Sequence, residues 1–286
     1  MIINEKIGII GSGFVGSSVK FGFSPQTNCE AEIFIYDKDE NLATHTLNEV
    51  VENSDIIFIS VPTPSNADGS ICLDIINNLF EDLVKIKGHD KPIFLLRSTV
   101  TPGTCASFQE KFPSIQLVFN PEFLTERSAR LDFINQSRYI LGSNNEQATN
   151  KVAKLYQDRF GSTISIIRTN FQTAELIKYM NNCFFATKVS LMNEMYLVSE
   201  KCGADWEMAV EGFIRDGRIG HSHLAVPGPD GKFGFGGSCF PKDMQAIISY
   251  AKTLGIDLKT LSGAWETNLK VRPEKDWKKL KGRAVV

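Results

Sequence analysis

The sequence contains no CxxC pair, no apolar run approaching ~20 residues and no block of like charge. Without such an apolar run we expect no membrane span, and the first residues lack the features of a signal peptide. The six cysteines are scattered, which is typical of reduced thiols and predicts a cytoplasmic protein rather than a disulfide framework. A net charge of −2 makes nucleic acid a poor partner. His221 and His223 precede Cys239, but nothing else resembles a metal-ligand set, so no metal is expected.

Short apolar segments alternate with helix-compatible stretches through the first half of the chain. They lie at residues 6–10, 32–37, 55–62, 92–100, 115–120 and 138–143. This alternation is typical of parallel strands joined by crossover helices, so the fold class is expected to be α/β. A length of 286 residues suits two domains. We therefore predict a Rossmann-type, doubly wound parallel sheet in a first domain that spans residues 1–168.

A glycine-rich turn follows the first apolar segment and precedes a helix-compatible stretch. Its sequence is the dinucleotide-binding pattern GxGxxG, written here as Gly11-Ser12-Gly13-Phe14-Val15-Gly16. Gly11 allows a tight turn, Gly13 lets the backbone approach a pyrophosphate, and Gly16 lets the helix pack closely on the strand. Asp37 ends the second apolar segment, where a carboxylate binds the ribose hydroxyls of NAD and repels the 2′-phosphate of NADP. We therefore expect NAD, held by residues 11–16 and by Asp37.

Polar residues cluster after three later apolar segments, at residues 60–66, 97–103 and 120–126. Such clusters also suit plain turns, because proline, threonine, serine and asparagine favour turns. Ligands of parallel sheets bind at the carboxyl ends of the strands, however. We therefore expect the three clusters to share one cleft.

The middle of the chain has neither glycine nor proline between Gly161 and Gly203. This predicts one long helix over residues 169–202, whose apolar length indicates packing against a partner such as a second subunit. Glu175, Lys178 and Asn182 share one face of that helix, either as a solvated stripe or as part of a site.

Cys239 lies in the segment GFGGSCFPKD, residues 234–243, behind glycines and just before Pro241. Proline is favoured in the first turn of a helix, so we expect the cysteine just before a helix N-terminus. The N–H groups and dipole there, with Lys242 nearby, would favour the thiolate. The glycines would let a substrate reach the sulfur.

A thiolate in a chain that also binds a nicotinamide cofactor limits the reactions that the protein can catalyse. The thiolate can trap an aldehyde as a thiohemiacetal, a second hydride loss gives a thioester, and water releases an acid. The combination predicts a four-electron oxidation of an alcohol to a carboxylate. A cysteine hydrolase using His221 or His223 would leave the dinucleotide motif unexplained. A hydroxyacid dehydrogenase that transfers one hydride would not need Cys239.

Five motifs resemble those of the UDP-glucose/GDP-mannose dehydrogenase family. They are GSGFVG, STVTPG, NPEFLTE, AELIKYMNN, and RIG followed by GFGGSCFPKD. The resemblance implies NAD-dependent oxidation of a nucleotide sugar, with GFGGSCFPKD favouring UDP-glucose over UDP-N-acetylmannosamine and GDP-mannose. It also implies an all-helical central dimerisation domain over residues 169–270, and hence a homodimer.

The resemblance also implies the site residues. The catalytic residues would be Cys239, Lys178, Asn182, Asp243, Glu122 and Glu126, with Cys239 as nucleophile and Glu122 as the base for thioester hydrolysis. Lys178 and Asp243 would hold the catalytic water, and Asn182 would donate a hydrogen bond to the reacting oxygen. The cofactor would also contact Pro62, Thr63, Thr99, Glu126 and Lys242. The substrate would contact Glu122, Phe123, Leu124, Lys178, Asn182, Arg218, His223, Phe235 and Gly236, with Arg218 reaching into the neighbouring subunit.

The chain departs from the family pattern in two places. Residues 271–286 look like the start of a C-terminal nucleotide-binding domain that the chain does not contain. A longer loop, residues 221–232, precedes the glycines. The alternative to an active dehydrogenase is therefore a truncated NAD-binding dimer with little activity of its own.

Overall fold

The chain folds into two compact units. The computed structural model describes residues 1–286. The first unit comprises residues 1–63 and 73–178, and the second comprises residues 64–72 and 179–286. Helix α7 (Phe171–Cys202) begins in the first unit and ends in the second. No helix combines the length and the apolar character needed to cross a membrane.

The first unit is built on a seven-stranded sheet in the order β2-β1-β3-β4-β5-β6-β7. The strands are β1 (Ile7–Ile10), β2 (Ile33–Tyr36), β3 (Ile56–Ile59), β4 (Ile93–Leu96), β5 (Gln116–Phe119), β6 (Arg138–Gly142) and β7 (Ser165–Thr169). Strands β1 to β5 are all paired in parallel. The predicted parallel α/β sheet is therefore confirmed for these strands.

The sheet departs from the all-parallel prediction at β5 and β6, which pair antiparallel at Phe119 and Gly142. Their connection contains only the six-residue helix α5 (Ala129–Ile134), and the chain enters β6 without crossing back to the other end of the sheet. Strand β7 pairs in parallel with β6 and is not among the predicted strands. None of its residues is fully buried, so its sequence lacks the long apolar run that marks the inner strands.

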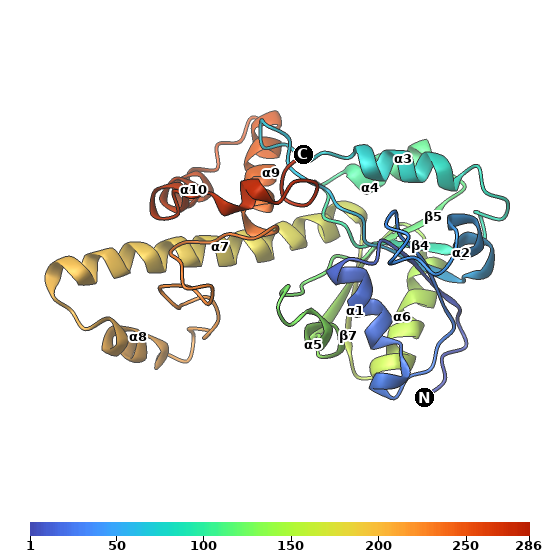
Figure 1. Ribbon diagram of the computed structural model, residues 1–286, viewed down its shortest axis with the longest axis horizontal. Coiled ribbons are helices and arrows are strands. Elements are labelled where there is room, and N and C mark those ends of the chain that lie inside the picture. Colours follow the sequence, from blue (N-terminus) through green and yellow to red (C-terminus); the bar gives the residue numbers. More distant parts are fainter. The chain divides into compact units, whose positions relative to one another are not determined.

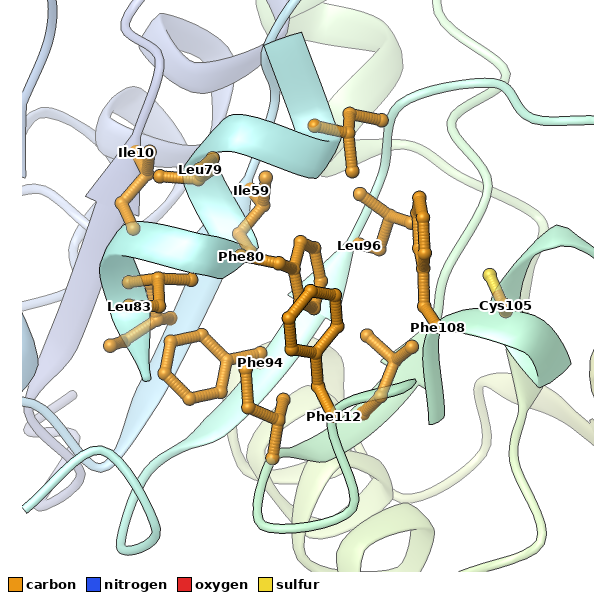
Figure 2. Close-up of a cluster of buried hydrophobic side chains, with 14 of the residues drawn as sticks. Ile10, Ile59, Leu79, Phe80, Leu83, Phe94, Leu96, Cys105, Phe108 and Phe112 are labelled. Carbon is orange, nitrogen blue, oxygen red and sulfur yellow. The ribbon is translucent and has the colours of Figure 1, made fainter. Parts of the chain in front are cut away.

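Helices cover both faces of the sheet (Figure 1). One face carries α1 (Phe14–Gly22), α5 and α6 (Glu146–Phe160), and the other carries α2 (Leu47–Asn53), α3 (Asp74–Leu83) and α4 (Thr104–Lys111). A short 3₁₀ turn, Pro25–Thr27, follows α1. Side chains alternate along each strand, so Phe58 enters the core beside α1 while Ile59 enters the core beside α3. Figure 2 shows the core beside α3 and α4, where the rings of Phe80 and Phe108 stack with centroids 5.2 Å apart.

The second unit is helical. It contains the rest of α7, together with α8 (Trp206–Ile214), α9 (Phe240–Thr253), α10 (Lys259–Val271) and a 3₁₀ turn at Asp276–Lys279. Gly203, with a φ of 72°, follows the end of α7, and Asp205 caps α8 by accepting a hydrogen bond from the backbone N–H of Met208. Apolar residues of α7, α9 and α10, such as Met244 and Ala264, form its core. The predicted helical second domain is thus confirmed.

Candidate active site

The glycine turn of the first unit has the shape that a dinucleotide requires. Gly11 has a φ of 87°, which favours glycine, and a Cβ there would lie 2.7 Å from the backbone oxygen of Ser60. A Cβ on Gly16 would overlap the backbone oxygen of Gly11, so only glycine lets α1 approach the turn. A Cβ on Gly13 would meet no protein atom within 4 Å. The turn therefore fits a pyrophosphate whose approach needs open space at Gly13.

Asp37 follows β2 and lies against the same turn. Its Oδ2 accepts a hydrogen bond from the backbone N–H of Ser12 at 2.5 Å, and its Oδ1 accepts one from Asp39 at 2.9 Å. The carboxylate is thus held at the carboxyl end of β2, the position predicted from the sequence. Such a position suits a carboxylate that binds ribose hydroxyls.

Alanine at position 13 and alanine at position 16 are expected to have different effects. Gly13→Ala should weaken NAD binding by about tenfold or more and leave the melting temperature unchanged, because its methyl group fills only the space left for the ligand. Gly16→Ala should destabilise the fold by about 1–3 kcal/mol, because its methyl group overlaps backbone. Calorimetric titration with NAD and thermal unfolding separate the two effects. A Gly13→Ala variant that binds NAD normally would refute this placement of the cofactor.

The ends of β3 and β4 come together, as the polar clusters predict. Thr63 Oγ1 donates a hydrogen bond to the backbone oxygen of Thr99 at 2.9 Å, and Ser98 Oγ donates one to that of Val61 at 2.6 Å. Both threonines are buried, whereas Pro62 is exposed. The two loops therefore form one rigid edge of the sheet at its carboxyl end.

Glu175 on α7 holds the loop after β4, a role that the sequence does not reveal. Its buried carboxylate accepts hydrogen bonds from the backbone N–H groups of Gly103 at 2.6 Å and Cys105 at 2.8 Å. These are the first N–H groups of α4, so Glu175 caps that helix. Burial raises the pKa of Glu175, and the two backbone donors oppose that rise. Its place beside Lys178 on one helix face is the only signal of this in the sequence.

Asn120 fixes the start of the loop that follows β5. Its Oδ1 accepts hydrogen bonds from Arg97 Nη1 at 2.8 Å and Tyr156 Oη at 2.6 Å, and its Nδ2 donates one to the backbone oxygen of Ile140. All of these side chains are buried. Burial raises the pKa of Tyr156 to about 12, so this phenol stays protonated as a donor at neutral pH. The network holds loop 120–126, which carries Glu122 and Glu126.

Lys178 and Glu122 form a buried ion pair in the first unit. Lys178 Nζ lies 2.8 Å from Glu122 Oε1 and donates a hydrogen bond to the backbone oxygen of Glu122 at 2.5 Å. The other carboxylate oxygen of Glu122 accepts from the backbone N–H of Leu124 at 2.7 Å. The ring of Phe123 lies 5.4 Å from the ammonium, whereas Glu126 is exposed. The structure thus brings together the predicted residues Lys178, Glu122, Phe123 and Leu124.

Asn182, Asp243 and Lys242 form a second buried cluster, which lies in the second unit. Asn182 Nδ2 donates a hydrogen bond to Asp243 Oδ2 at 2.6 Å, and Lys242 Nζ lies 2.6 Å from Asp243 Oδ1. Both carboxylate oxygens of Asp243 are therefore engaged. Lys242, which is expected beside the cofactor, has its ammonium paired with Asp243 here.

Cys239 is the N-cap residue of α9, directly before Phe240. Pro241 is the second residue of that helix rather than the first, so the predicted helix start is displaced by one residue. The cysteine is partly exposed, and its backbone oxygen accepts the first helical hydrogen bond, from the N–H of Asp243 at 2.9 Å. Gly237, with a φ of 73°, leads into it and would place no Cβ near another atom. The geometry places a partly exposed cysteine at a helix N-terminus, where the dipole favours an anion.

Three other predicted substrate residues occupy different environments. Arg218 is exposed and pairs with Asp216. His223 stacks on the ring of Phe185 with centroids 4.2 Å apart, and burial, aided by Lys188, lowers its pKa. Phe235 is part of the core of the second unit. His223 therefore tends to be neutral at physiological pH.

The parallel sheet with its glycine turn defines the class of dinucleotide-binding oxidoreductases. The chain belongs to the UDP-glucose/GDP-mannose dehydrogenase family, whose NAD binding domain matches residues 32–159 and whose central domain matches residues 172–270. The residues that match the NAD binding domain lie in the first unit, except for residues 64–72.

Similar proteins include UDP-glucose 6-dehydrogenase of Rickettsia bellii, 38% identical over 236 residues that cover 80% of this chain and 52% of that protein. UDP-glucose 6-dehydrogenase TuaD of Bacillus subtilis is 32% identical over 303 residues, covering 94% and 64%. A UDP-glucose dehydrogenase from the archaeon Pyrobaculum islandicum has a similar structure, with a TM-score of 0.81 and 25% identity, covering 93% of this chain and 68% of that one. The chain spans about half the length of the Rickettsia relative.

Proposed function

We propose that this protein oxidises UDP-glucose to UDP-glucuronate with two molecules of NAD⁺. The observation that carries the proposal is Cys239, placed behind glycines at the N-terminus of α9 in a chain with an NAD-binding domain. Relatives 38% and 32% identical are named UDP-glucose 6-dehydrogenase, which supports UDP-glucose over UDP-N-acetylmannosamine and GDP-mannose.

Cys239 allows a single site to oxidise an alcohol through the aldehyde to a carboxylic acid. NAD⁺, when bound, accepts hydride. The sugar C6 alcohol loses a proton and a hydride to become an aldehyde, and the Cys239 thiolate adds to that carbon to form a thiohemiacetal. Loss of a second hydride gives a thioester. Water then attacks the carbonyl, the C–S bond breaks, and the carboxylate and the thiolate are released.

Buried charged and amide groups supply the remaining chemistry. The Lys178 ammonium is proposed to stabilise the developing alkoxide, and Glu122, held against it, to take a proton from the hydrolytic water. Asn182 is proposed to donate to the reacting oxygen, with Asp243 orienting its amide. Lys178 and Asn182 lie four residues apart on α7, and therefore on one face of it. Glu126 remains a proposed contact of the cofactor.

The test is to supply the purified chain with UDP-glucose and NAD⁺ and to measure NADH per sugar. Two NADH and one UDP-glucuronate are expected for each UDP-glucose. One NADH per sugar would indicate a dehydrogenase that stops at the carbonyl. NAD binding without any NADH would contradict the proposed activity for this chain. Parallel reactions with UDP-N-acetylmannosamine and GDP-mannose test the choice of sugar.

We further propose a homodimer built on α7. This helix exposes a stripe of large apolar side chains, of which Phe184 is 65% and Met180 is 63% accessible to solvent. The stripe consists of Leu176, Met180, Phe184, Leu191, Met195 and Val198. Contiguous apolar surface of this kind mostly marks a protein interface.

Phe184→Asp is expected to convert the dimer into a monomer, because it places a charge in the middle of the apolar stripe. Glu200→Ala, an exposed polar position on the same helix, should leave the dimer intact and serves as the control. Light scattering after gel filtration measures the molar mass. A wild-type monomer, or a Phe184→Asp variant that stays dimeric, would refute the proposed interface.

A further inference from the structure

The glycine loop that precedes Cys239 rests on three buried polar residues that the proposed reaction does not use. They are Asn193 on α7, Asn268 on α10 and Arg272, the residue that follows α10. All of them belong to the second unit, as does the loop itself. Each binds the backbone of residues 233–235.

The two asparagines bind consecutive residues of the loop. Asn193 Oδ1 accepts a hydrogen bond from the N–H of Gly234 at 3.0 Å. Asn268 Oδ1 accepts one from the N–H of Phe235 at 2.7 Å, and its Nδ2 donates one to the oxygen of Phe235 at 3.0 Å. Asn268 thus satisfies both backbone groups of one residue, as a neighbouring strand would.

Four hydrogen bonds hold the guanidinium of Arg272. It donates to both carboxylate oxygens of Asp276 at 2.8 Å, to Asp230 at 2.7 Å, and to the backbone oxygen of Phe233 at 3.2 Å. Burial alone would lower the pKa of Arg272, but the hydrogen bonds to Asp276 and Asp230 outweigh it and raise the pKa. The group is therefore charged and fixed at both ends of its planar head.

The loop fits against this support without spare room. A Cβ on Gly234, whose φ is 65°, would overlap Asn268 Oδ1, and a Cβ on Gly236 would lie 2.5 Å from Arg272 Nη2. Arginine side chains normally give way to a methyl group, but this one is tied to two carboxylates. A side chain at position 236 would therefore displace the loop backbone, because the Arg272 guanidinium occupies the space that its Cβ needs.

We propose that Asn193, Asn268 and Arg272 are positioning residues that hold the glycine loop and thereby place the Cys239 sulfur at the N-terminus of α9. The inference rests on the proposed function of Cys239 as nucleophile. Residues 236–238 connect the bound segment 233–235 to Cys239, so a shift of Gly236 is separated from the cysteine by only two residues. A displaced sulfur would take a different place relative to the N-terminus of α9, whose dipole favours the thiolate.

The test is the alkylation rate of Cys239 by iodoacetamide in the full chain, measured by mass spectrometry of its peptide. The exposed Cys202 on α7 provides an internal reference in each molecule. Gly236→Ala is expected to lower the Cys239 to Cys202 rate ratio by about tenfold, because thiolate content sets the rate. Lys270→Ala, an exposed position on α10, should leave the ratio unchanged.

A double-mutant cycle tests whether the effect passes through Arg272. In an Arg272→Lys background the flexible ammonium can move away, so Gly236→Ala should lower the ratio by about threefold or less. NAD affinity should stay unchanged in all variants. An unchanged or raised ratio in Gly236→Ala, or the same loss in both backgrounds, would overturn the inference.

Asn193→Ala provides a second route if Gly236→Ala does not fold. It removes the acceptor for Gly234, together with a hydrogen bond to the backbone oxygen of Val189 within α7, and should also lower the ratio, by about threefold. An unchanged ratio in folded Asn193→Ala counts against the inference. Alkylation of Cys239 needs no turnover. If the chain shows no dehydrogenase activity, the proposed function fails, but the alkylation ratios still test whether the three residues position Cys239.

Discussion

Cys239→Ala is expected to reduce the formation of UDP-glucuronate by about 10⁴-fold or more, the scale seen when a covalent nucleophile is removed. The first hydride transfer needs no covalent bond to sulfur, but the second requires the thiohemiacetal. The NADH yield should therefore fall from two per sugar to one or none. Stopped reactions analysed for NADH, aldehyde and acid measure each stage separately.

Two further variants sharpen this test. Cys202→Ala removes an exposed thiol on α7 and should leave both the rate and the NADH yield unchanged. Cys239→Ser keeps the size of the side chain but replaces the thiolate with a poor nucleophile, so it should also form no acid. Persistence of two NADH per sugar in Cys239→Ala would exclude the covalent route.

Lys178→Ala is expected to cost about 3–5 kcal/mol in the free energy of unfolding, because it leaves the Glu122 carboxylate buried without its partner. The same change should lower the turnover rate by about 10²–10³-fold if the ammonium stabilises an alkoxide. Urea unfolding of the variant, followed by circular dichroism, measures the first effect, and steady-state kinetics measures the second.

The pair of Lys111 and Glu81 provides a matched control on the same unit. It has a similar separation, 2.9 Å, but both of its side chains are about half exposed. Lys111→Ala should therefore cost at most about 1 kcal/mol. The double variant Lys178→Met with Glu122→Gln should lose less stability than Lys178→Ala alone, because no charge is left buried. Equal costs for Lys178→Ala and Lys111→Ala would contradict the buried pair.

Local sequence patterns predict the inner part of the sheet and the place of the nucleophile. Strands β1, β3 and β4 are buried at every position, so their sequences are continuous apolar runs. Pro241 marks the start of α9 to within one residue. The exposed strand β7 gives no such local signal. The apolar segment at residues 138–143 predicts β6 as a strand but not its antiparallel pairing with β5, which is decided by tertiary structure.

The supporting hydrogen bonds of the site could not be predicted from the sequence. Glu175 binds a residue 70 positions away, and Asn268 binds one 33 positions away. An acidic or amide side chain on a helix can be exposed to solvent or can form a buried hydrogen bond. The sequence pattern is the same in both cases, so it does not distinguish them. Only the resemblance to the family distinguishes Lys178 and Asn182 from a solvated stripe.

Arg272 also has a consequence for the order in which the chain can fold as it is made. Asp276 supplies two of the hydrogen bonds that fix Arg272, and the next residue, Trp277, is buried. The loop before Cys239 is thus translated before two of the three residues that hold it, Asn268 and Arg272. During synthesis from the N-terminus, the nucleophile can take its final position only after Trp277 has left the ribosome.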